Sequence, residues 1–315
     1  MIKLTGIIDI GTNTVKLLVI RNTEDDTPLF VHKRIFPTKT GQGSFGQNRI
    51  TDAAAERTLE ALKKAVTLAK GYECTTLKAF ATAALRNADN STELTNRVRE
   101  ELGLDIEIIS GNREAELIYY GVKNAVKLGA QPVLIMDIGG GSTEYIIADE
   151  NQILYKHSYN HGVGTLLEKF EIPGKIRPID RENIKFYIYE TTRNLQEALA
   201  RFPCQHIIGC SGSFKTFYQI IKSGEHLEDE PEVKKEPVAY PFDERFPETL
   251  KKLIASDESE RLLTPGIPEM RVDTIHIAAL LTKTTIENLN LKSYSYSSYS
   301  MVEGVWFEET LNSEQ

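Results

Sequence analysis

The sequence is poor in the residues on which small secreted domains and membrane proteins depend. Only three of its 315 residues are cysteine, and Cys74, Cys204 and Cys210 show no paired spacing. This excludes a disulfide framework and a cysteine-based zinc site, and it favours a reducing cytoplasm. No apolar run approaches the roughly 18 residues that a membrane span needs. The apolar start of the chain meets Asp9 too early for a signal peptide. We therefore expect a cytoplasmic protein with no membrane partner.

Positive charge is also scarce. The chain holds 37 Lys and Arg against 45 Asp and Glu, which gives a formal net charge of −8. No run of basic residues interleaved with aromatics is present, so we expect no nucleic-acid partner. The remaining composition, with 41% hydrophobic and 26% charged residues, is typical of a globular protein and excludes a disordered one. The length suits two domains.

The opening pattern of the chain returns one domain length later. A buried strand, the tripeptide Asp-Ile-Gly, a turn of small residues and a second apolar strand follow one another from Ile7 and again from Val133. The two aspartates, Asp9 and Asp137, lie 137 − 9 = 128 positions apart. A repeat of this size predicts two duplicated α/β domains that face each other.

Hydrophobic periodicity and turn residues predict the other elements. Helices are expected at about residues 51–71, 83–86, 111–129, 178–202, 242–255 and 269–291, with further helix starts near 90 and 301. Strands are expected at about 29–35, 77–80, 205–208 and 294–298, and a buried strand at 104–109.

Both Asp-Ile-Gly turns are candidate phosphate loops. Glycine lets backbone amides approach an anion, and successive N–H groups can surround phosphate oxygens. A tight hairpin turn is the structural alternative, but recurrence at domain spacing favours phosphate binding. A strand rather than a helix follows each turn, which excludes the dinucleotide-binding pattern. The candidate phosphate-binding residues are Gly11, Thr12, Asn13, Gly139, Gly140, Gly141, Ser142 and Thr143, with Gly212 and Ser213 in a third small-residue turn.

Acidic residues flank these turns. Asp9 and Asp137 each end a buried strand beside a loop, where Mg²⁺ (or Mn²⁺) is held by one or two carboxylates together with waters and phosphate oxygens. Glu114 lies in the first turn of a predicted helix, so helix capping is its structural alternative. Arg86 could grip phosphate bidentately or be a solvated helix residue. His157 and the neighbouring His161 lack a third ligand and are interpreted as structural.

Four segments in this order resemble the exopolyphosphatase/guanosine-pentaphosphate phosphatase family of the actin-like, Hsp70-like and sugar-kinase-like superfold: residues 8–19, 81–90, 109–115 and 137–144. Residues 209–213 and 268–273 add weaker agreement. The resemblance implies two duplicated ribonuclease-H-like α/β domains around a cleft. Residues 1–125 with 301–315 would form the first domain, onto which the last helix returns, and 126–300 the second.

The resemblance also implies roles. Glu114 corresponds to the catalytic base, Asp137 and Glu144 to the carboxylates that position metal and water, and Arg86 and Asn13 to phosphate-gripping groups. The implied reaction releases the terminal phosphate of polyphosphate or of guanosine pentaphosphate, with Mg²⁺ or Mn²⁺ as cofactor. A small-molecule kinase of the same superfold and a non-catalytic guanosine penta- or tetraphosphate sensor remain alternatives, and a homodimer stays open.

Three features depart from the family pattern. Val302 stands where the family usually has an arginine, and Arg113 stands where many members have an acid. The chain also stops at Gln315, before the extra helical domains of longer members. We therefore expect a preference for short substrates.

Overall fold

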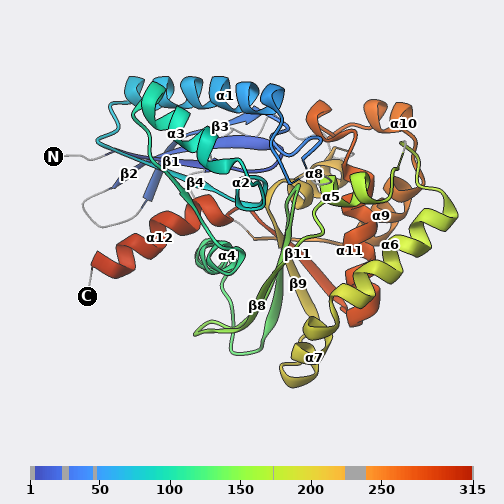
Figure 1. The fold of residues 1–315 in the computed structure, drawn as a ribbon. Coiled ribbons are helices and arrows are strands. Elements are labelled where there is room, and N and C mark those ends of the chain that lie inside the picture. The colour runs from blue at the N-terminus through green and yellow to red at the C-terminus, as the bar shows by residue number, and fades with distance from the viewer. Residues whose placement is uncertain (1–3, 23–27, 45–47, 173, 224–238, 314–315) are drawn as a thin grey trace.

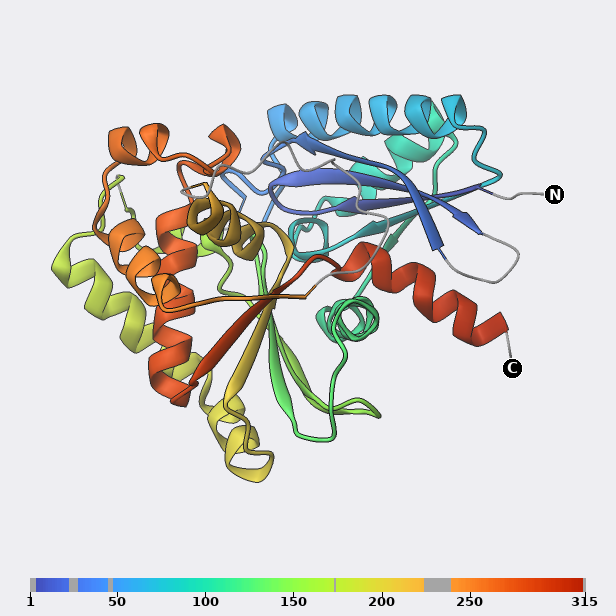
Figure 2. The same ribbon diagram turned by 180° about the vertical axis from the view of Figure 1, so that it is seen from behind.

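Two helix-covered β-sheets make up the protein, and they lie side by side (Figures 1 and 2). A computed structural model describes residues 4–22, 28–44, 48–172, 174–223 and 239–313. The first sheet contains β1 (Leu4–Ile10), β2 (Thr14–Asn22), β3 (Pro28–Pro37), β4 (Thr76–Ala81) and β5 (Ile106–Ile108). Its helices are α1 (Asp52–Gly71), α2 (Ala83–Arg86), α3 (Ser91–Leu102) and α4 (Gly111–Ala125).

The second sheet is larger. Its strands are β6 (Val133–Ile138), β7 (Thr143–Ala148), β8 (Ile153–Tyr159), β9 (His206–Cys210), β10 (Ala239–Pro241) and β11 (Ser293–Ser297). The helices of this half are α5 (Val163–Lys169), α6 (Pro178–Thr191), α7 (Arg193–Arg201), α8 (Ser211–Lys222), α9 (Arg245–Ala255), α10 (Glu258–Leu263) and α11 (Ile275–Leu289), with a 3₁₀ turn, η1, at Glu269–Arg271. Helix α12 (Met301–Ser313) follows β11.

The two sheets repeat one topology. The first has the order β3-β2-β1-β4-β5, and the second has β8-β7-β6-β9-β11 with β10 added at the edge. In each sheet the first three strands in the chain are antiparallel neighbours. The first of them, β1 or β6, also pairs in parallel with the fourth strand, β4 or β9. The repeat seen in the sequence is therefore a repeat of fold, which confirms the predicted pair of duplicated α/β domains. The predicted boundaries between the domains stay a prediction.

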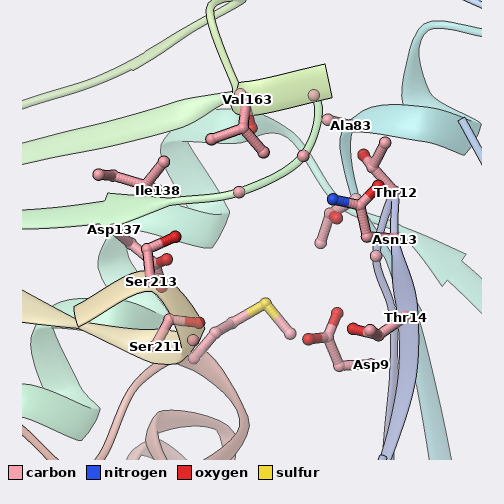
Figure 3. Close-up of a pocket in the computed structure, with 18 of the residues that line it drawn as sticks. Asp9, Thr12, Asn13, Thr14, Ala83, Asp137, Ile138, Val163, Ser211 and Ser213 are labelled. Carbon is pink, nitrogen blue, oxygen red and sulfur yellow. The ribbon is translucent and has the colours of Figure 1, made fainter. Parts of the chain in front are cut away.

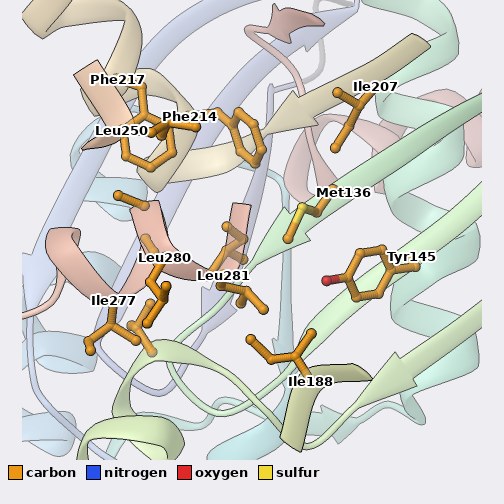
Figure 4. Close-up of a cluster of buried hydrophobic side chains, with 14 of the residues drawn as sticks. Met136, Tyr145, Ile188, Ile207, Phe214, Phe217, Leu250, Ile277, Leu280 and Leu281 are labelled. Carbon is orange, nitrogen blue, oxygen red and sulfur yellow. The ribbon is translucent and has the colours of Figure 1, made fainter. Parts of the chain in front are cut away.

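Burial on both faces explains the apolar character of the central strands. All six residues of β7 are buried, as are five of the six in β6, because helices cover both sides of the sheet. In the core of the second half, Met136 and Tyr145 face Phe214 of α8 and Leu281 of α11 (Figure 4). The Tyr145 hydroxyl lies 2.8 Å from the Thr285 hydroxyl, so the one polar atom of this ring is satisfied.

Helix α12 packs closely against α4. A Cβ atom on Gly304 would lie 1.7 Å from the Leu117 carbonyl oxygen, and one on Gly121 would lie 2.0 Å from that of Ser300. Only glycine permits this approach of the two backbones. Arg113 of α4 forms an ion pair with Glu308 of α12, so the basic residue that departs from the family pattern has an acidic partner.

Several predicted elements differ from the structure. The helix expected at 178–202 is broken at Thr192, whose hydroxyl donates to the Ile188 carbonyl at 2.7 Å, a bond that bends helices. The helix expected at 269–291 is divided between η1 and α11. The strand expected to be buried at 104–109 is shorter and lies at the sheet edge, where Ile108 is 38% exposed. Strand β8 and helix α5 were not predicted.

None of the helices in the described part of the chain combines the length and the apolar character that crossing a bilayer requires.

Candidate active site

A cavity of about 100 Å³ lies where the hairpin loops of the two sheets meet (Figure 3). The loop between β1 and β2 forms one wall and the loop between β6 and β7 the other. Most of the predicted site residues line it: Asp9, Gly11, Thr12, Asn13, Glu114, Asp137, Gly139, Gly140, Gly141, Ser142, Glu144, Gly212 and Ser213. The tertiary structure thus brings residues from positions 9 to 213 together around one small space.

The two loops have the same turn and almost touch. The Gly11 amide donates to the Thr14 carbonyl at 2.9 Å, and Gly139 donates to Ser142 at the same distance. A Cβ atom on Gly140 would lie 2.8 Å from both the Asn13 side-chain nitrogen and the Thr12 Cβ. Only glycine fits at this approach, which explains why the second loop carries more glycine than a hairpin alone requires.

The loop carbonyls accept hydrogen bonds from neighbouring segments. Amides of α5 and the residues before it donate to the carbonyls of Gly139, Gly140 and Gly141. The amides of Thr38 and Lys39 donate to the Asn13 carbonyl. The loop amides of Gly140, Gly141 and Ser142 donate to no backbone carbonyl of the described residues. Successive free N–H groups of this kind form an anion-binding concavity.

The duplication places opposite charges at equivalent positions. Asp9 pairs across its hairpin with Lys16, and Asp137 pairs across its own with Glu144. The Lys16 ammonium donates to Asp9 Oδ2 at 2.9 Å. Burial disfavours its charge, but Asp9 and Asp137 outweigh this and raise the pKa of Lys16. Burial raises the pKa of Asp137, while Lys16 opposes that rise.

Two carboxyl groups, Glu114 and Glu144, lie beside the loops. Arg86 Nη1 donates to Glu114 Oε2 at 3.0 Å and to the Ile109 carbonyl at 3.1 Å. The hydroxyls of Ser142 and Ser158 donate to Glu144 Oε1 at 2.7 and 2.6 Å. Burial and Glu144 raise the pKa of Glu114, against the opposing effect of Arg86. Burial and Asp137 raise the pKa of Glu144 to about 7.

Comparison with known proteins decides the family. The chain matches the sequence model of the Ppx/GppA phosphatase family over residues 18–313. The chain belongs to this family. The crystal structure of an exopolyphosphatase from Cytophaga hutchinsonii is similar, with a TM-score of 0.92, 32% sequence identity and 98% of each chain covered. The structure of the Aquifex aeolicus family member, 23% identical with a TM-score of 0.77 and all of both chains covered, shows the same fold.

Curated relatives match over part of their length. A bifunctional 3-dehydroquinate synthase/phosphatase of Fusobacterium nucleatum is 31% identical over 200 residues, which are 60% of this chain and 30% of that protein. Exopolyphosphatase 1 of Mycobacterium tuberculosis is 29% identical over 175 residues, which are 55% of this chain and 51% of that protein. The chain therefore spans about half or less of the length of these relatives. The predicted family is confirmed.

Two predicted site residues do not line the cavity of this family member. Arg86 instead holds Glu114 through its ion pair, and its buried Nη2 has no hydrogen-bond partner among the described residues. The buried Thr143 hydroxyl donates to the His161 carbonyl at 3.2 Å, so it supports the loop from behind. His161 itself is buried and stacks on Tyr159 at 5.2 Å between ring centroids.

Three further residues with functional chemistry line the cavity, and the sequence analysis did not select them: Lys16, Ser211 and Arg271. Lys16 could have been found by its spacing, because it follows Asp9 by the same seven positions as Glu144 follows Asp137. Ser211 has a left-handed backbone, with φ of 64°, and its hydroxyl bonds Asp137 and favours the charged carboxylate. No sequence signal shows that conformation.

Arg271 lies in one of the weaker family segments and reaches the cavity beside Gly212. A Cβ atom on Gly212 would lie 1.8 Å from Arg271 Nη2. The guanidinium donates to the Thr216 hydroxyl at 3.1 Å and forms no ion pair with the described residues. Burial lowers its pKa. A partly buried cation without a carboxylate partner among the described residues is suited to an anionic ligand.

The residues present fit a magnesium ion. Asp9 Oδ1 is buried and has no hydrogen-bond partner among the described residues, and Asp137 lies on the wall formed by the facing loop. No group of three His, Cys, Asp or Glu side chains in the described part of the chain could hold a metal by itself. Two carboxylates completed by water and phosphate oxygens are the arrangement that Mg²⁺ accepts.

Proposed function

We propose that this protein is a phosphohydrolase that releases the terminal phosphate of inorganic polyphosphate. The observation that carries the proposal is the pair of amide-lined loops that meet beside Glu114, a carboxyl whose burial raises its pKa. A carboxylate with a raised pKa accepts a proton more readily than an ordinary glutamate does, so it is suited to act as a general base. The similarity to exopolyphosphatases supports the choice of substrate.

The geometry supports a role for each residue. The loop amides would hold the terminal phosphate, and Lys16 and Arg271 would balance the charge of the chain. Glu114 would orient a water molecule for in-line attack on phosphorus and accept its proton, while Arg86 keeps the carboxylate in position. Asp9 and Asp137 would hold Mg²⁺ or Mn²⁺, which supplies charge neutralisation on the phosphate oxygens when bound.

The test is orthophosphate release across a panel of substrates. Tripolyphosphate, longer polyphosphates and guanosine pentaphosphate are compared with and without Mg²⁺ or Mn²⁺. We expect release from polyphosphate that stops in EDTA, and a higher metal requirement in Asp137→Ala. Binding of guanosine pentaphosphate without turnover would indicate a sensor, and ATP consumption only with an acceptor would indicate a kinase. Full activity after exhaustive EDTA treatment would contradict the metal proposal.

Short substrates are the proposed preference. The formal net charge of −8 provides no overall attraction for a long polyanion. Val302, where relatives usually have arginine, is buried in the hydrophobic cluster around α4 and α12 and cannot contribute charge. A chain held only at its end should lose affinity slowly with salt. Efficiency that climbs to chains of hundreds of phosphates with a steep salt dependence would contradict this preference.

A further inference from the structure

A second cavity, of about 320 Å³, adjoins the phosphate cavity. Its volume is within the range of small-molecule binding pockets. Both halves of the molecule contribute to its walls. These include Ser44 and Asn48 before α1, Ala83 of α2 and the following Asn87, and Gly141 and Asn160 of the second half. Ala83 and Gly141 line both cavities, so the two spaces have these wall residues in common.

Because Ala83 lines both cavities, its position shows on which side of the phosphate cavity the second cavity lies. Ala83 and Ser211 are on opposite sides of the phosphate cavity (Figure 3). The Ser211 side also holds Gly212 and the guanidinium of Arg271, which packs against it. This cationic side suits the anionic remainder of the substrate, which is the leaving group.

In-line phosphoryl transfer places the attacking and leaving oxygens on opposite sides of phosphorus. If the leaving group lies toward Arg271, the attacking oxygen approaches from the side of Ala83. Glu114 lines the phosphate cavity together with Ala83 and its neighbour Thr82. The second cavity, which has Ala83 as a wall residue, therefore lies next to the nucleophile side of the reaction.

The lining of the second cavity is polar but uncharged. Its described polar side chains are the hydroxyls of Ser44 and Thr165 and the carboxamides of Asn48, Asn87 and Asn160. No Lys, Arg, Asp or Glu is among the described residues that line it. A chain of phosphates carries several negative charges and would require cations here in addition to the bare amide of Gly141. Carboxamides and hydroxyls both donate and accept, so they suit a neutral compound that carries hydroxyl groups.

We propose that the second cavity is an acceptor site for a small neutral polyol, to which the protein transfers the terminal phosphate in competition with water. The inference rests on the proposed function, because the phosphate cavity must hold the donor. The acceptor oxygen forms a bond to phosphorus as the bond from phosphorus to the bridging oxygen breaks. The acceptor proton passes to Glu114, and the electron pair leaves with the shortened phosphate chain.

The experiment incubates the protein with tripolyphosphate, Mg²⁺ and increasing glycerol, and ³¹P NMR separates glycerol phosphate from orthophosphate. We expect glycerol phosphate whose share of the product rises and then saturates. Asn87→Leu and Asn160→Leu, from opposite walls, should each lower the transfer-to-hydrolysis ratio about tenfold, the effect of one lost hydrogen bond. Orthophosphate release without glycerol should change less than about twofold, since neither side chain lines the phosphate cavity.

Asn183→Leu is the matched control, because Asn183 is an exposed residue of α6 and lines neither cavity. Orthophosphate release without any glycerol phosphate would overturn the acceptor site and leave the proposed function standing. Transfer that grows linearly with glycerol concentration and is unchanged in both wall variants would also overturn the acceptor site. Such a result would mean that glycerol attacks from bulk solvent without being bound. Absence of any phosphate release would overturn both proposals.

Discussion

The surroundings of Glu114 raise its pKa and fix the position of its carboxyl group. Its side chain is only 12% exposed and Arg86 holds it at 3.0 Å, while the nearby carboxyl group of Glu144 helps to raise its pKa. In Glu114→Gln the shape and the arginine contact are retained, but the side chain can no longer accept a proton. We expect a loss of about 10²–10⁴-fold in kcat with an unchanged melting temperature.

Glu116→Gln is the control for this change, because Glu116 is on the same helix but pairs with Lys156 and Arg113 outside the cavity. Steady-state phosphate release and thermal unfolding measure both variants. If Glu114→Gln retained most of its activity, Glu114 would be a helix-capping residue only.

The raised pKa of Glu144 predicts how the stability of the protein depends on pH. Its pKa is raised from 4.5 to about 7 in the folded protein, so the folded state retains a proton that the unfolded state has already lost. The free energy of unfolding should therefore fall as pH rises from about 4.5 through 7. The shift corresponds to a loss on the order of 3 kcal/mol for this group.

Thermal unfolding at pH 5 and pH 8 in a chelating buffer tests this prediction. Glu144→Gln should melt several degrees higher than the wild type at pH 8 and close to it at pH 5, because the amide mimics the protonated acid. Glu150→Gln, at an exposed position, is the control and should melt like the wild type at both values. Equal melting temperatures of Glu144→Gln and the wild type at pH 8 would show that ionisation of Glu144 does not destabilise the folded protein.

At the scale of the element, the backbone of the second hairpin loop lies directly against the side chains of the first at Gly140. A Cβ atom on Gly140 would meet both Thr12 and Asn13 at 2.8 Å, and the loops would have to separate. A displacement of about 1 Å at a reacting centre can cost roughly 10²-fold. We therefore expect Gly140→Ala to lower kcat/KM by about 10²-fold.

Gly129→Ala provides the matched comparison, since a Cβ atom there has no neighbour within 4 Å. Both variants should fold, as circular dichroism and melting curves would show, and only Gly140→Ala should lose activity. Similar kcat/KM values for the two alanine variants would mean that the loops do not need their close contact.

At the scale of the whole molecule, an exposed ion pair links the two halves. Lys39, after β3, lies 2.6 Å from Asp273, after η1. Exposed pairs contribute at most about 1 kcal/mol, so stability should change little when this one is broken. Arg271 and Thr274, on either side of Asp273 in the chain, line the cavity, so breaking the pair should affect substrate binding more than stability.

We expect Lys39→Asp to raise KM up to about fivefold, the factor that corresponds to 1 kcal/mol, with less effect on kcat. The swapped double variant, Lys39→Asp with Asp273→Lys, should recover the wild-type KM. Lys63→Asp is the control, because Lys63 pairs with Glu60 and Glu101 within the first half. A KM that stays raised in the swapped variant would show that the residues act independently.

Local patterns in the sequence were enough to predict the parts of this protein that depend on neighbouring residues. The two hairpins follow from apolar runs around a small-residue turn, and their recurrence 128 positions apart predicted the duplicated topology. Thirteen of the predicted site residues line one cavity because most of them lie on those two turns. Strand β8 was missed because its residues are only partly buried and lack an apolar alternation.

The tertiary structure alone decided the partners of the site residues. Arg86 pairs with Glu114, 28 positions away in the chain, and its grip on phosphate stays a prediction. Arg271 reaches the cavity only because Gly212 leaves room for its guanidinium. Charge, burial and pKa at these positions result from packing between distant segments, and no local pattern encodes which segments meet. The second cavity has the same origin, since its walls come from both halves of the chain.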